Sequence, residues 1–137
     1  MITFFDSNIF VYALDRAEPV KQPKALARIE QARAEGNVAL STQVLHEFYS
    51  ICTRKLKPAL THASAAQAIH HLCEFVVLGS TALSVQSALV LVQQHQIGWW
   101  DALILEAALR SDADVLVSED GQHERRFGKL RVENPFI

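Results

Sequence analysis

The sequence predicts an α/β fold, a three-layer α/β/α sandwich in which a mostly parallel sheet of about five strands lies between two layers of helices. Short apolar runs typical of buried strands alternate along the chain with longer segments of helical periodicity. Parallel strands need crossover connections, so this alternation favours helices on both faces of the sheet. The chain has 137 residues, 50% hydrophobic and 20% charged, and we expect one globular domain over residues 1–137.

The individual elements are predicted from the apolar pattern and the turn residues between them. Runs of three or four apolar residues between turns indicate strands, and longer alanine-rich or i, i+4 patterned segments indicate helices. In chain order we expect a strand at 2–5, helices at 8–14 and 24–35, a strand at 38–40, a helix after residue 42, a connector at 56–60, a helix ending near 72, a strand at 75–78, helices at 83–94 and 99–109, a strand at 115–117 and a short strand at 131–133.

Several helix ends carry residues suited to starting or stopping a helix. Pro23 fits the first turn of the second helix, and Gly36 fits its C-terminal stop. Ser41 and Thr42 can cap the third helix, and Thr61 can cap the fourth. These residues therefore mark the helix boundaries independently of the apolar pattern.

The two helices in the second half of the chain differ in their apolar pattern. In the helix at 83–94, Val85, Leu89 and Val92 fall on one side. The helix at 99–109 is apolar almost all round, so we expect it to be largely buried.

Four acidic residues stand beside apolar segments that are far apart in the chain. Asp6 follows the first strand directly, and Asp120 lies just beyond the strand at 115–117. Because ligands of parallel sheets bind at the carboxyl ends of the strands, both should face one cleft. Glu47 lies at the edge of the apolar face of its helix, and Asp101 lies at the start of the buried helix. Four elements can thus deliver carboxylates to one place.

These carboxylates point to a metal site. A carboxylate beside an apolar core is costly unless a cation compensates it. Mg²⁺ and Mn²⁺ prefer oxygen ligands and retain waters, and such ions can hydrolyse phosphodiesters. Taken singly, each acid also has an ordinary explanation: a helix cap for Asp6, a first-turn anion for Asp101, a surface residue for Glu47 and a turn residue for Asp120.

The ordered set of acids resembles the PIN-domain family of metal-dependent nucleases, especially the small toxin ribonucleases of the VapC type. The likeness begins at Asp6-Ser7-Asn8, passes through Glu47 and Trp100-Asp101-Ala102, and ends with Ser118-Glu119-Asp120 and Asn134-Pro135-Phe136. It implies a PIN-like sandwich. It also implies a Mg²⁺- or Mn²⁺-dependent endoribonuclease, whose catalytic and metal-binding residues are Asp6, Glu47, Asp101 and Asp120.

Three further residues are candidates for a supporting role by the same resemblance. Asn8 matches a small polar residue that follows the first aspartate, with a plain helix start as the alternative. Ser118 matches a serine or threonine two residues before the fourth acid and can hold Asp6 or a water by hydrogen bonding. Glu119 and Asp120 are adjacent, so either can be the fourth acid, and the Ser118-x-Asp120 spacing favours Asp120.

The net charge, the tryptophans and the basic residues give weaker evidence about nucleic-acid binding. The net charge of −2 argues weakly against broad non-specific binding. Trp99 and Trp100 can stack on bases, although bracing the core is the commoner role. Two basic groups can meet phosphates or can simply be solvated: Arg54, Lys55 and Lys57, and Arg125, Arg126, Lys129 and Arg131.

The resemblance further implies a toxin of a type II toxin–antitoxin pair, with RNA as substrate and a small antitoxin as partner. A homodimer is possible through the apolar faces of Leu26 and Ile29 or of Ile69 and Leu72, which core packing explains equally well. No signal peptide or membrane-length apolar stretch occurs, so we expect a cytoplasmic protein without membrane contact. The alternatives are a catalytically silent RNA-binding or scaffolding module of the same fold, and a metal-dependent phosphatase.

Overall fold

A computed structural model describes residues Met1–Ile137. The helices are α1 (Ser7–Leu14), α2 (Lys21–Glu35), α3 (Thr42–Arg54), α4 (His62–Leu72), α5 (Ala82–His95) and α6 (Trp99–Arg110). The strands are β1 (Ile2–Phe5), β2 (Asn37–Ser41), β3 (Val76–Leu78), β4 (Val115–Val117), β5 (Arg126–Phe127) and β6 (Leu130–Glu133). Every element predicted from the sequence is present, with boundaries that shift by at most a few residues.

The strands form one six-stranded sheet in the order β3-β2-β1-β4-β6-β5. All neighbours are parallel except β5 and β6, which form an antiparallel hairpin at one edge. The predicted mostly parallel sheet is therefore confirmed. The strand that the sequence did not indicate is β5, which has only two residues and so carries no periodic signal.

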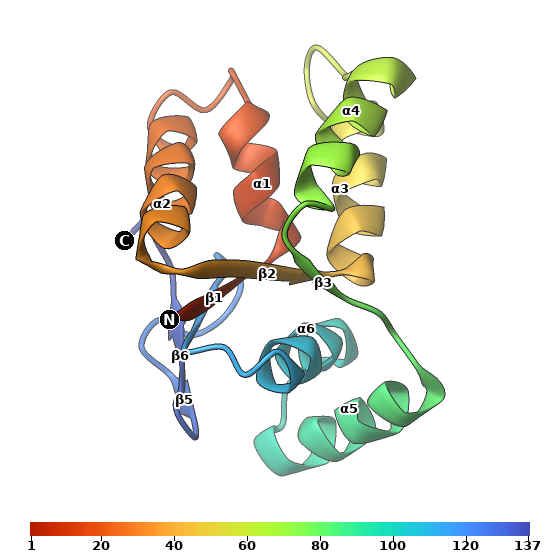
Figure 1. Cartoon of the computed structure of the whole chain (residues 1–137), viewed down its shortest axis with the longest axis vertical. Coiled ribbons are helices and arrows are strands. Elements are labelled where there is room, and N and C mark those ends of the chain that lie inside the picture. The colour runs from red at the N-terminus through yellow and green to blue at the C-terminus, as the bar shows by residue number, and fades with distance from the viewer.

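The helices cover both faces of this sheet, as the sequence predicted. Figure 1 shows α1 to α4 on one side of the sheet and α5 and α6 on the other. The chain thus passes from β1 through α1 and α2 to β2, and from β2 through α3 and α4 to β3. It then crosses to the opposite face through α5 and α6 and returns to β4, on the other side of β1.

This route creates a switch point between β1 and β4, where successive crossovers leave the sheet in opposite directions. At such a point the loops after two adjacent parallel strands diverge and leave a crevice, which is where open α/β sheets bind ligands. The pairing of Phe5 with Val117 places the residues after both strands side by side. The backbone N–H of Asp6 continues this pairing by donating to the carbonyl of Val117 at 3.0 Å.

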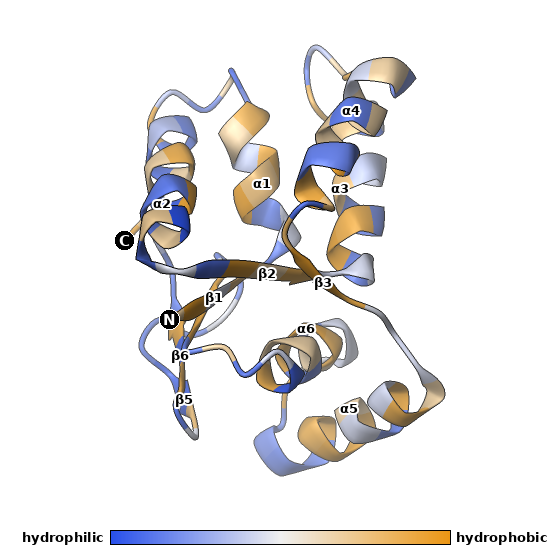
Figure 2. Cartoon of the chain, in the orientation of Figure 1, coloured by the Kyte–Doolittle hydropathy of each residue, from blue (hydrophilic) through white to orange (hydrophobic).

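The core fills the space between the sheet and both helix layers. Phe4, Phe5, Leu40 and Val117 on the central strands are fully buried, as expected for a parallel sheet that is covered on both faces. Phe48 of α3 packs into the same core. Figure 2 shows the apolar residues gathered on β1 and β2, with polar residues on the outer helix surfaces. None of the helices has the length and hydropathy needed to cross a membrane.

The predicted helix boundaries have clear physical causes. The hydroxyl of Ser41 accepts from the N–H of Val44, and that of Thr61 accepts from the N–H of Ser64. Gly36 ends α2 because the chain passes close to Met1 there, and a side chain would collide with the Met1 carbonyl. These contacts fix the ends of α2, α3 and α4.

The burial of α5 and α6 is uneven. Leu89 of α5 is 56% exposed, because α5 packs mainly against α6 and its buried residues are Ser84 and Ala88. The buried residues of α6 lie between Ala102 and Ala108, and Trp100 in its first turn is 66% exposed. The prediction that Trp100 braces the core was therefore wrong.

Replacing Phe48 by alanine should destabilise the fold by about 3–5 kcal/mol, because the deletion leaves a cavity in a fully packed core. The measurement is the free energy of unfolding in urea. Leu89→Ala is the matched control, and its effect should stay within about 0.5 kcal/mol because the side chain is exposed. Equal losses in the two variants would contradict the burial described here.

Candidate active site

The four predicted acids come from four different elements. Asp6 caps the start of α1, and Glu47 lies in the second turn of α3. Asp101 lies in the first turn of α6, and Asp120 lies in the loop after β4. Asp6, Asp101 and Asp120 line one pocket, while Glu47 is joined to Asp6 through Ser7. We refer to these four acids as the carboxylate site.

Asp6 is the buried member of the site, with 7% of its surface exposed. Its Oδ2 accepts a hydrogen bond of 2.7 Å from the Ser118 hydroxyl. Its Oδ1 accepts one of 2.7 Å from the backbone N–H of Ser7. The β1–β4 register brings Ser118 beside Asp6, so the sheet itself positions this carboxylate.

Ser7 connects Asp6 to Glu47. Its hydroxyl lies 3.0 Å from Glu47 Oε1, to which it donates, and at 3.5 Å from Asp6 Oδ1. Gln43 lies one turn before Glu47 and approaches its other oxygen at 3.5 Å. Sequence reasoning gave Ser7 no role, because the contact joins residues 40 positions apart and leaves no local pattern.

Asp120 is exposed but is held in place. Asn8 Nδ2 donates to Asp120 Oδ2 at 3.1 Å, and Asn8 Oδ1 accepts from the N–H of Glu119 at 3.4 Å. The N–H of Asp120 donates to the Ser118 hydroxyl at 3.1 Å. Asn8 and Ser118 therefore hold the loop that carries Asp120.

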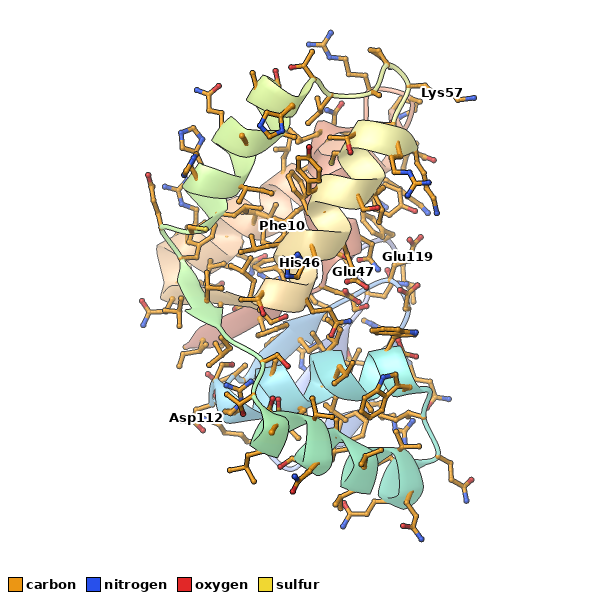
Figure 3. The ribbon with its side chains drawn as sticks, turned by 90° about the vertical axis from the view of Figure 1, so that its right-hand side faces the viewer. Phe10, His46, Glu47, Lys57, Asp112 and Glu119 are labelled. Atoms are coloured by element: carbon orange, nitrogen blue, oxygen red, sulfur yellow. The ribbon has the colours of Figure 1, made fainter.

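Glu119 is engaged elsewhere. Its carboxylate forms an ion pair with Lys21 and accepts a hydrogen bond of 2.7 Å from the Tyr12 hydroxyl. The Lys21 ammonium also lies 4.7 Å from the Tyr12 ring centre and 5.4 Å from that of Phe136. Figure 3 shows Glu47 and Glu119 on the same side of the molecule, yet only Glu119 has a cationic partner. We call this group, Tyr12, Lys21, Glu119 and Phe136, the Lys21 cluster.

The pKa values of Asp6 and Asp101 in the carboxylate site and that of Glu119 in the Lys21 cluster shift in opposite directions. Burial raises the pKa of Asp6 to about 6, although the hydrogen bonds from Ser118 and Ser7 oppose the shift. Desolvation and the charge of Asp120 raise the pKa of Asp101. Burial also acts on Glu119, but the hydrogen bonds from Lys21 and Tyr12 outweigh it and lower the pKa of that carboxyl. The carboxylate site thus carries an uncompensated cost of burial, which Lys21 and Tyr12 offset at Glu119.

The donor set of the carboxylate site fits a hard divalent cation. It consists of oxygens, and no member of it forms an ion pair with a lysine, arginine or histidine. No three acidic, histidine or cysteine side chains are gathered closely enough to form a complete metal-binding group on their own. An ion that takes one or two carboxylates and keeps several waters suits such an open set, and Mg²⁺ behaves in this way.

The two basic groups differ in their relation to the site. Arg125 lines the pocket that contains Asp6, whereas Lys129 is paired with Asp112 and Asp114. In Figure 3, Lys57 lies beyond the end of α3 that is distant from Glu47. Of the predicted phosphate-binding residues, only Arg125 lies beside the acids.

Carboxylates without cationic partners thus lie at the switch point of a mostly parallel α/β sheet. The model of the PIN domain matches residues 3–128. The chain belongs to the PIN-domain family. No curated protein sequence matches it.

Solved structures of similar fold come from several bacteria. VapBC2 of Rickettsia felis, bound to a promoter DNA fragment, has 21% identity and a TM-score of 0.67, with 98% of each chain covered. A toxin–antitoxin complex of Klebsiella pneumoniae has 17% identity and a TM-score of 0.69, with 97% of each chain covered. VapC20 of Mycobacterium tuberculosis, a toxin that cleaves the sarcin-ricin loop, has 17% identity and a TM-score of 0.61, with 83% of this chain and 86% of that one covered.

The lowered pKa of Glu119 predicts a pH-dependent contribution to stability. A carboxyl whose pKa is lowered by folding stabilises the native state above its ordinary value, 4.5 here, and loses that contribution as the pH falls through the lowered value. Lys21→Met should therefore be less stable than the unchanged protein at pH 7, and the gap should shrink by pH 3. The readout is the urea midpoint at each pH.

Lys24→Met serves as the control, because Lys24 is exposed on the same helix and forms no ion pair. A gap that widens toward low pH, or one that Lys24→Met reproduces, would refute the assignment of this effect to Glu119.

Proposed function

We propose that this protein is a metal-dependent endoribonuclease that hydrolyses phosphodiester bonds in RNA at the carboxylate site. One observation carries the proposal: Asp6, a carboxylate with its pKa raised by burial, lies with Asp101 and Asp120 in one pocket at the switch point of a PIN domain, and no cation is paired with them. A bound divalent ion is the simplest compensation for this charge.

The residues of the chain have separate roles in this proposal. Asp6 is the fixed ligand, because Ser118 and Ser7 restrain both of its oxygens. Asp101 and Asp120 hold the ion from the exposed side of the pocket, and Glu47 holds it or its waters from α3. Mg²⁺ or Mn²⁺, when bound, acidifies a coordinated water and offsets charge that develops on the phosphate. Ser118 and Asn8 keep the ligands in place, so they act as positioning residues.

Asp120 rather than Glu119 is the fourth acid in this proposal. Lys21 already forms an ion pair with Glu119, and the Tyr12 hydroxyl also donates a hydrogen bond to its carboxylate. The carboxylate of Asp120 accepts only from the neutral amide of Asn8 and has no cationic partner, so it is free to bind a metal ion.

The proposed substrate is polymeric RNA, cut to leave a 5′-phosphate and a 3′-hydroxyl. Support comes from the similar structure that cleaves an RNA loop and from the open, exposed side of the pocket that Asp101 and Asp120 form. A phosphatase for small esters and a silent RNA-binding module are the competing functions, and substrate preference and metal dependence separate them.

We further propose that the protein is the toxin of a toxin–antitoxin pair, acts in the cytoplasm as a single domain, and is inhibited by a small partner that covers the site. The support is that similar structures are toxin–antitoxin complexes, matched over nearly their full length. Of the two faces proposed for a dimer, that of Leu26 and Ile29 is better supported than that of Ile69 and Leu72, since Leu26 is 47% exposed and Leu72 is buried.

Cleavage of RNA by the purified protein should require Mg²⁺ or Mn²⁺ and should stop with EDTA. Asp6→Asn and Asp120→Asn should each lower kcat/KM on the order of 100-fold or more, because each removes a ligand. Glu119→Gln is the matched control beside Asp120 and should retain most activity. Cleavage of a chromogenic phosphate monoester in preference to RNA would favour the phosphatase, and metal binding without any cleavage would favour the silent module.

Mg²⁺ should also stabilise the folded protein, because a ligand of the native state alone shifts unfolding by mass action. At a Mg²⁺ concentration of about 100 times Kd the gain is about 2.7 kcal/mol. The thermal midpoint of the unchanged protein should rise with Mg²⁺ and return with EDTA, whereas that of Asp6→Asn should not move. An equal rise in both would assign the effect to another site.

A further inference from the structure

The pocket that contains three of the acids extends away from them along an apolar wall. Ile104 and Leu105 of α6, Leu116 of β4 and Val132 of β6 line this extension. The whole pocket, acids included, has a volume of about 160 Å³, and an apolar cavity of roughly 150 Å³ is enough to admit a benzene-sized ring. The pocket therefore has room for one planar ring system beside the carboxylates.

The segment that leads into the β5–β6 hairpin forms part of the pocket wall. Arg125 Nη2 donates to the carbonyl of His95 at 3.1 Å, and its guanidinium lies 4.8 Å from the centre of the Phe127 ring. The Phe127 ring in turn packs edge-on against the His95 ring, with centres 4.8 Å apart. These contacts hold Arg125 at the pocket without a carboxylate partner.

Arg125 is the only cationic side chain among the residues that line this pocket. Its position contrasts with Lys129 and Arg131, which follow it closely in the chain and are paired with acids. The pocket thus combines a cation without a carboxylate partner, three carboxylates and an apolar wall.

We propose that this extension of the pocket binds one nucleobase of the RNA, next to the phosphodiester that is cut, with Arg125 and Phe127 as its contacting wall. The inference rests on the proposed function, since a phosphodiester at the acids brings the neighbouring base within reach. A base has apolar faces and a polar edge. The apolar wall suits its faces, whereas Gln122 and Arg125 offer donors for the acceptors on its edge.

Gly121 contributes to the same pocket through its lack of a side chain. A Cβ at this position would lie 2.8 Å from Val132 Cγ1, so any larger residue would push the loop or the wall into the space. The loop that carries Asp120 can therefore lie against β6, and the acid and the proposed base site become neighbours.

The test compares RNA oligonucleotides that differ by one abasic residue next to the cut. Arg125→Ala should raise KM about tenfold on the intact oligonucleotide, the size expected for the loss of one stacked base, and should have little effect on the abasic one. Arg125→Lys keeps the charge but loses the planar group, so it should restore part of the loss. Phe127→Leu keeps the wall apolar and tests the ring alone.

Arg126→Ala is the matched control, because Arg126 is the exposed neighbour of Arg125 at the start of β5 and forms no ion pair. Its KM should stay within about twofold of the unchanged protein. Thermal midpoints of all variants show that the fold is retained.

The outcomes separate this inference from the proposed function. If the unchanged protein cleaves RNA with metal but Arg125→Ala and the abasic substrate behave normally, the base site is refuted and the nuclease stands. If these variants weaken only the binding of a protein partner, the pocket serves that partner and the base site is again refuted. If the unchanged protein cleaves no RNA under any metal condition, the nuclease proposal itself has failed.

Discussion

The fold is arranged around one buried carboxylate, that of Asp6, at the junction of β1 and β4. An unpaired charge in this position opposes folding, and the structure limits the cost with short hydrogen bonds from Ser118 and Ser7 rather than with a cation. The parallel pairing of β1 with β4 is what brings Ser118 into position. The crossover of α5 and α6 to the opposite face makes this pairing possible, so the hydrogen bonding of Asp6 depends on the order of the strands in the sheet.

Two adjacent acids in the loop after β4 differ in their partners. Glu119 pairs with Lys21 and tethers the loop to α1 and α2, whereas the carboxylate of Asp120 has no cationic partner and accepts only from the amide of Asn8. The two side chains reach different partners, so one loop carries both a paired and an unpaired acid. The ion pair of Glu119 and the unpaired carboxylate of Asp120 both follow from the conformation of this loop.

The sequence predicted the architecture well, because it depends on local signals: apolar runs that end at polar residues, and the alternation of strand and helix. The same signals indicated the four acids, of which the structure brings Asp6, Asp101 and Asp120 into one pocket. The sequence could not identify contacts between distant side chains. Lys21 carries no mark of its pairing with Glu119, and Arg125 is indistinguishable in the sequence from the paired Arg131. The exposure of Leu89 was not predictable either, because helical periodicity identifies an apolar side but not whether another element covers it.

The positions of the acids along the chain bear on when the site can exist at all. Asp6 is among the first residues to be synthesised, but Ser118 and Asp120 follow only after β4, which occupies the middle of the sheet beside β1. An emerging polypeptide therefore has neither a complete central sheet nor a complete set of carboxylates until most of it has left the ribosome. Native contacts that span so much of the chain form late, because the intervening segment has to be ordered first. During translation, the first acid of the carboxylate site is therefore synthesised well before the site can be complete.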